Sequence, residues 1–84
     1  MIDREDFLRY FLKQEADLRA FIGALVFDPH RREDIFQEVA LTLWSQFAVY
    51  DSTRPFGAWA RGIAAKKILL LNDVIPTVVD FYSI

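Results

Sequence analysis

The sequence contains no cysteine, a single histidine, three glycines and three prolines. Without cysteine the chain has no disulfide framework and no thiolate metal site, which suits a reducing compartment. Because His30 stands alone, we expect no metal centre and no cofactor. The sequence also shows no catalytic serine or cysteine triad and no glycine-rich phosphate loop. These absences predict a protein that is not an enzyme and has no catalytic residues.

Long apolar runs are missing as well. No stretch approaches the ~18 apolar residues of a membrane-spanning helix. The start, Met-Ile-Asp-Arg-Glu-Asp, is too acidic and polar for a signal peptide. We therefore expect a soluble cytoplasmic protein without a membrane partner. The 84 residues are 54% hydrophobic and include eight phenylalanines, which is enough for one small core.

Charge is unevenly distributed along the chain. The net charge of -2 predicts no nucleic-acid partner by itself. However, residues 54–72 contain no acid and carry four cations, Arg54, Arg61, Lys66 and Lys67. An acidic chain with a locally basic segment can still present one face to phosphates. The two interpretations left open are a solvated helix surface and a phosphate-binding face.

The spacing of apolar residues predicts an all-α fold, a small bundle of three to four helices. The first helix is expected over residues 2–27, with Asp3 as its cap. Gln14 and Glu15 interrupt its apolar stripe, which predicts a kink or a break there. Asp28-Pro29-His30 predicts a turn.

A polar loop is expected over residues 49–54. Pro55 then suits the first position of a helix over 55–71, with Ser52 or Thr53 as its cap. Residues 1–72 are thus expected to form one helical domain. The apolar tail 73–84 either packs back as a short helix or binds another partner.

The central helix, expected over residues 34–50, carries more apolar surface than one buried face needs. On a helical wheel its core arc comprises Ile35, Phe36, Val39, Ala40, Leu43 and Phe47. Its polar side comprises Asp34, Glu38, Thr42 and Ser45. A seam between them comprises Gln37, Leu41, Trp44 and Ala48. Either Leu41 and Trp44 form the rim of a broad core, or the seam and the acidic side bind another protein.

Two motifs occur in order. They are Asp34-Ile35-Phe36-Gln37-Glu38-Val39, with Trp44 further along the same helix, and Phe56-Gly57-Ala58-Trp59-Ala60-Arg61-Gly62-Ile63-Ala64 after the polar loop. The pair resembles region 2 of bacterial RNA polymerase sigma factors of the extracytoplasmic-function (ECF) type. The resemblance covers about residues 5 to 69. It implies a small helical bundle that acts in transcription initiation.

The resemblance also implies two partners, the RNA polymerase core and promoter DNA. The central helix of the family docks on the clamp helices of the polymerase β′ subunit. The corresponding patch here comprises Asp34, Gln37, Glu38, Leu41 and Trp44. The family loop captures a flipped base of the minus-ten element, and the helix after it contacts the same strand. The implied DNA-binding residues are Tyr50, Asp51, Ser52, Thr53, Arg54, Arg61, Lys66 and Lys67, with the rings of Tyr50 and Phe56 beside the base.

The sequence departs from the family pattern after Ala65. Lys66 stands where the family usually has asparagine, and Leu70 where it has a polar residue. These departures and the apolar tail favour an alternative function, a stand-alone interaction module or decoy that binds polymerase or an anti-sigma factor with little DNA activity. Since 84 residues leave no room for a region 4, we expect either an excised domain or a short protein that kept the core-binding half.

Overall fold

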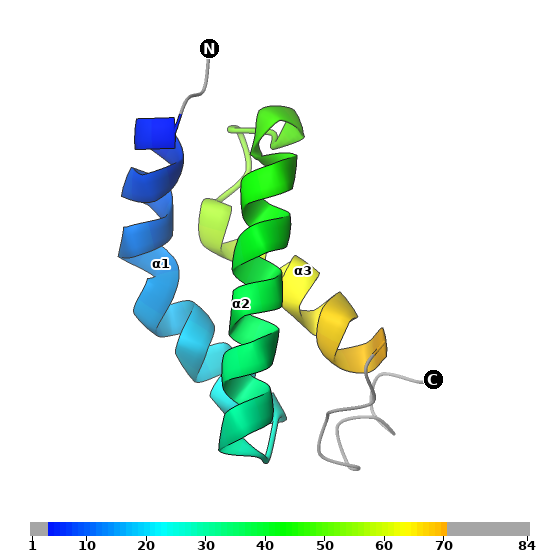
Figure 1. Cartoon of the computed structure of the whole chain (residues 1–84). Coiled ribbons are helices and arrows are strands. Elements are labelled where there is room, and N and C mark those ends of the chain that lie inside the picture. Colours follow the sequence, from blue (N-terminus) through cyan, green and yellow to red (C-terminus); the bar gives the residue numbers. More distant parts are fainter. Residues whose placement is uncertain (1–3, 71–84) are drawn as a thin grey trace.

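The computed structural model describes residues 4–70, which form three α-helices and one short 3-10 helix (Figure 1). The α-helices are α1 (Arg4–Leu25), α2 (Pro29–Gln46) and α3 (Phe56–Leu70), and the 3-10 helix is η1 (Phe47–Val49). Figure 1 shows α1 and α2 side by side, with α3 crossing behind α2, and all three pack on one another. The all-α prediction is confirmed. The expected cap Asp3 and the tail 73–84 lie outside the described residues.

Helix α1 is a single uninterrupted helix of 22 residues. Of the two predicted alternatives at Gln14 and Glu15, the break is therefore wrong, whereas the bend of the α1 ribbon in Figure 1 agrees with a kink. Polar residues interrupt the apolar stripe without ending the helix, because they find partners within the fold. Arg19, one turn beyond Glu15, lies 3.3 Å from its carboxylate, and the side chain of Gln14 packs beside Gly57.

Helix α2 begins at Pro29, five residues earlier than the central helix was expected to begin. Asp28 has extended backbone angles, and its carboxylate accepts a 2.9 Å hydrogen bond from the backbone N–H of His30. Asp28 is thus an N-cap, and Pro29 occupies the first helical turn, where its missing N–H costs nothing. The turn predicted over Asp28-Pro29-His30 is correct only at its first residue, since the other two are helical.

Helix α3 begins at Phe56, one residue after the predicted start. The carbonyl oxygen of Pro55 accepts from the backbone N–H of Trp59 at 3.2 Å, so Pro55 lies just outside the helix. The predicted cap, Ser52 or Thr53, is therefore wrong, because Pro55 occupies the position directly before the helix. The Thr53 hydroxyl donates to Asp51 at 2.7 Å.

The core is apolar and rich in aromatic side chains. Five of the six predicted core positions are buried. They are Ile35, Phe36, Val39 and Leu43 on α2, and Phe47, the first residue of η1. The ring of Phe7 on α1 lies edge-on to two other rings. Its centroid is 5.2 Å from that of Phe47 and 6.2 Å from that of Phe56. These rings join α1, η1 and α3 near the start of α3. Within residues 4–70, none of the helices is long and apolar enough to cross a membrane.

Candidate functional site

The five residues expected to bind polymerase all lie exposed on one face of α2. We call this set, Asp34, Gln37, Glu38, Leu41 and Trp44, the α2 strip. Their separations of three and four residues place them along one side of the helix. Leu41 is 68% exposed, whereas Leu43, two residues further on, is fully buried. The α2 strip therefore runs along the side of the helix that the core does not use.

The Trp44 side chain contacts the core but remains partly exposed. Its ring lies edge-on to Phe7 of α1, with centroids 5.3 Å apart, yet the residue remains 40% exposed. Trp44 thus combines the two interpretations that the sequence left open, since it borders the core and also presents apolar surface. Leu41 has no such contact with the core rings and belongs to the exposed surface.

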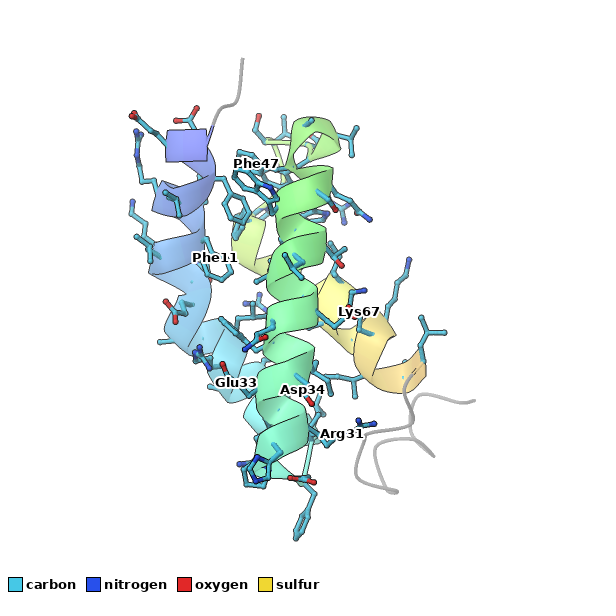
Figure 2. All side chains as sticks on the ribbon, in the orientation of Figure 1. Phe11, Arg31, Glu33, Asp34, Phe47 and Lys67 are labelled. Atoms are coloured by element: carbon cyan, nitrogen blue, oxygen red, sulfur yellow. The ribbon has the colours of Figure 1, made fainter. Side chains whose placement is uncertain are left out.

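A cluster beside the α2 strip joins α1 to α2, and no sequence pattern predicts it. Arg19 donates to Glu33 at 2.8 Å, and its guanidinium carbon lies 3.8 Å from the ring centroid of Phe36. Figure 2 shows Glu33 on the side of α2 that faces α1. The hydrogen bond from Arg19 lowers the pKa of Glu33 and raises that of Arg19. Spacing within one helix cannot predict this pair, because the partner carboxylate is 14 residues away on another helix.

The loop after η1 is folded by its own side chains. The Tyr50 hydroxyl donates a hydrogen bond to the carbonyl oxygen of Arg54. Asp51 accepts from both the backbone N–H and the hydroxyl of Thr53, at 2.9 Å and 2.7 Å. These two bonds lower the pKa of the Asp51 carboxyl. The loop is therefore held in one conformation by bonds at both of its ends.

The rings expected to lie beside a flipped base are in the core. Tyr50 is 7% exposed and Phe56 is 5% exposed. Tyr50 stacks on Trp59 with centroids 4.5 Å apart, and burial raises the pKa of its hydroxyl. Neither ring presents an open face in this structure. The sequence pattern identifies these aromatic residues but does not show that their rings face the core.

A pocket of about 530 Å³ lies between α1, the loop and the start of α3. Its lining includes five of the eight residues expected to bind DNA, namely Tyr50, Ser52, Thr53, Arg54 and Arg61. Three cations, Lys13, Arg54 and Arg61, border it, and no acidic residue does. We call this hollow the loop pocket. It combines positive charge, hydroxyl groups and aromatic edges, which suits a nucleotide better than a basic or purely apolar ligand.

The remaining expected DNA-binding residues are elsewhere. Asp51 is exposed outside the loop pocket. Lys66 lines a separate hollow of about 300 Å³ together with Arg54 and Gly62. Lys67 lies 3.8 Å from the carboxylate of Glu38, and Figure 2 shows it on the part of α3 next to α2. Lys66 and Lys67 also line a further hollow of about 220 Å³ with Leu70, so the predicted cations do not share one site.

In the described part of the chain, no group of three or more His, Cys, Asp or Glu residues is placed to hold a metal ion. The family model described as sigma-70 region 2 matches residues 10–70, which include both sequence motifs. No curated protein and no solved structure matches the chain.

Proposed function

The chain belongs to the sigma-70 region 2 family, and from this premise we propose that it is an ECF-type domain that docks on the β′ clamp helices of RNA polymerase and engages the promoter minus-ten element. Membership itself assigns the domain to transcription initiation and to a non-enzymatic role. The docking surface is the α2 strip, and the DNA surface is the loop pocket with the adjoining face of α3. Such a domain acts in the cytoplasm, where the polymerase is.

The exposure of Leu41 supports the docking proposal most strongly. Leu41 is 68% exposed, and the exposed acids Asp34 and Glu38 precede it on the same side of α2. Exposed apolar side chains with a charged rim are typical of interface anchors. Trp44 adds a large, partly fixed aromatic surface, so less side-chain freedom is lost when it is bound. The acids favour a partner that carries basic side chains.

Docking is tested with a fluorescently labelled peptide pair or fragment that contains the β′ clamp helices. The Leu41→Ala variant is expected to weaken binding by about 2 kcal/mol, or about thirtyfold, because an interface anchor is truncated. Leu12→Ala is the matched control, since Leu12 is 64% exposed on α1 outside the α2 strip. Equal affinities of the two variants would remove the α2 strip from the interface.

The Gln37→Ala Trp44→Ala double variant tests the polar and aromatic parts of the same strip. We expect it to weaken clamp binding while the helical circular dichroism signal is kept. Since Trp44 contacts Phe7, the double variant is compared with wild type at a temperature well below its unfolding midpoint. Undiminished binding would contradict the assignment.

DNA engagement is supported by the acid-free lining of the loop pocket. Arg54 and Arg61 lie at its edge, and Ser52 and Thr53 add hydroxyl groups. Cations that contact phosphates make affinity fall with salt, with a slope of roughly -0.7 per neutralised phosphate for single strands. We therefore expect non-template minus-ten oligonucleotides to bind at low salt and to dissociate as salt rises. Arg61→Ala is expected to make that slope shallower.

The alternative function, an interaction module or decoy with little DNA activity, is favoured by one specific observation. Lys67 is paired with Glu38 of the α2 strip, and the exposed positions that follow it on α3, Leu69 and Leu70, are both apolar. The end of α3 therefore offers less free charge than the sequence suggests. Clamp or anti-sigma binding without oligonucleotide binding at low salt would select this alternative.

A further inference from the structure

One wall of the loop pocket comes from α1, which neither motif includes. Tyr10, Lys13 and Gln14 line the loop pocket from this helix. Separations of three and four residues put their side chains on one helical face. This face meets the loop and the start of α3 across the hollow, so the pocket has two independent walls.

The α1 wall supplies the exposed ring that the loop lacks. Tyr10 is 41% exposed, whereas Tyr50 and Phe56 are buried. Tyr10 stacks on Phe56 at 5.6 Å with an interplanar angle of 13°. The inner side of its ring is thus fixed by the core while part of the ring borders the pocket. A fixed, partly exposed aromatic ring is a suitable platform for an unstacked base.

Gln14 is held at the pocket by the absence of a side chain on Gly57. A Cβ added to Gly57 would lie 2.5 Å from Gln14 Oε1 and 3.0 Å from its Cδ. Gly57 is buried in the first turn of α3, so the close approach is part of the packing of α1 against α3. Any larger residue at position 57 would force the Gln14 amide to move.

The polar groups of this wall are available for a ligand. Within residues 4–70, neither Lys13 nor Gln14 makes a side-chain hydrogen bond or ion pair. Lys13 can therefore pair with a phosphate, and the Gln14 amide can both donate to and accept from the edge of a base. The volume of about 530 Å³ lies within the range of about 300–1,000 Å³ that is usual for small-ligand sites.

From this arrangement we infer that the α1 wall binds one unstacked nucleotide of single-stranded DNA, with Tyr10 beneath the base, Gln14 on its edge and Lys13 on a phosphate. The inference rests on the proposed function and extends it, because it moves base reading from the loop to α1. Arg54 of the loop and Arg61 of α3 then hold the strand on the opposite wall.

The test measures the affinities of the 84-residue chain for fluorescein-labelled dA12, dC12 and dT12 by anisotropy at several salt concentrations. Wild type is expected to bind all three, with a spread of about fivefold or more between the tightest and the weakest, because an amide pairs differently with each base. Gln14→Ala and Gly57→Ala are expected to reduce this spread to less than about twofold. Gly62→Ala is the glycine control, since a Cβ there meets nothing within 4 Å.

Lys13→Ala is expected to weaken all three oligonucleotides and to make the salt slope shallower by about 0.7. Arg9→Ala is the matched control, because Arg9 is a cation on the same helix that does not line the loop pocket. Equal effects of these two variants, or an unchanged spread in Gln14→Ala, would overturn the inference and leave the proposed DNA function standing. A wild-type chain that binds none of the oligonucleotides at low salt would overturn both.

Discussion

Lys67 of α3 and Glu38 of α2 form an ion pair, with Nζ and Oε2 3.8 Å apart. Glu38 belongs to the α2 strip, and Lys67 belongs to the helix expected to contact DNA. The pair therefore connects the two proposed surfaces directly. Because Glu38 remains 59% exposed, the contact is a surface ion pair that solvent screens.

This pair should matter more for binding than for stability. We expect Lys67→Ala to change the free energy of unfolding by less than about 0.5 kcal/mol, measured by urea denaturation. The same variant leaves Glu38 free for a basic partner, so affinity for the clamp fragment should not decrease. Glu38→Gln should have the same small effect on stability and should weaken clamp binding. Loss of more than about 2 kcal/mol in either variant would show a buried pair instead.

Leu41 and Leu43 lie on opposite faces of α2 and should respond differently to truncation. Leu43 is fully buried, so Leu43→Ala should lower the free energy of unfolding by about 2–5 kcal/mol through the cavity it leaves. Leu41→Ala should stay within about 0.5 kcal/mol of wild type. Thermal or urea denaturation of the two variants checks both values. Similar losses would mean that Leu41 is also a core residue.

The buried hydroxyl of Tyr50 should stabilise the loop. Tyr50→Phe keeps the ring contacts and removes the hydrogen bond to Arg54, so we expect a loss of about 1 kcal/mol. Burial raises the pKa of Tyr50, so its neutral form is favoured in the folded state. Its contribution is therefore complete below about pH 10, the ordinary tyrosine pKa, and is lost as pH rises through the higher folded value.

Denaturation curves measured between neutral and alkaline pH separate the loss of the Tyr50 hydrogen bond from the titration of the Tyr50 hydroxyl. The wild-type chain should lose stability at alkaline pH more steeply than Tyr50→Phe does. Parallel pH dependences would show that the Tyr50 hydroxyl titrates normally and is not buried.

The Asp51 carboxyl should titrate below its ordinary pKa of about 3.9. Its two hydrogen bonds from Thr53 favour the charged form. Because the folded pKa is lowered, the associated stability is present above the unfolded value and is lost as pH falls through the folded value. Carboxyl carbon NMR shifts followed against pH give the midpoint. Thr53→Val removes only the hydroxyl bond and should move the midpoint back upward, whereas an unchanged midpoint would contradict this cause.

The core of α2 was predictable because its signal is local. Five apolar residues recur at helical spacing, and that spacing alone distinguishes Val39 and Leu43 from Leu41. The start of the helix was missed since Asp28-Pro29 is typical both of a turn and of an N-cap followed by the first helical residue. The helical bond from the backbone N–H of Arg32 to the carbonyl oxygen of Asp28, at 3.0 Å, distinguishes the two.

The parts of the site that were missed depend on contacts between distant residues. Nothing within α1 itself indicates that Lys13 lies opposite the loop. Gln14 and Glu15 were interpreted as a break because their partners, Gly57 and Arg19, are not visible in the apolar pattern. The burial of Tyr50 and Phe56 follows from how three helices meet, which periodicity within one helix cannot specify.

The central claim is that the face of α2 around Leu41 docks on the β′ clamp helices. The most direct test places a photo-crosslinking amino acid at position 41 and, in a second variant, at position 12 on α1. Each chain is then irradiated with RNA polymerase core, and the crosslinked subunit is identified by mass spectrometry. Position 41 is expected to crosslink to the clamp helices of β′, and position 12 is not. A crosslink from position 12 alone, or none to β′ from position 41, would contradict the account.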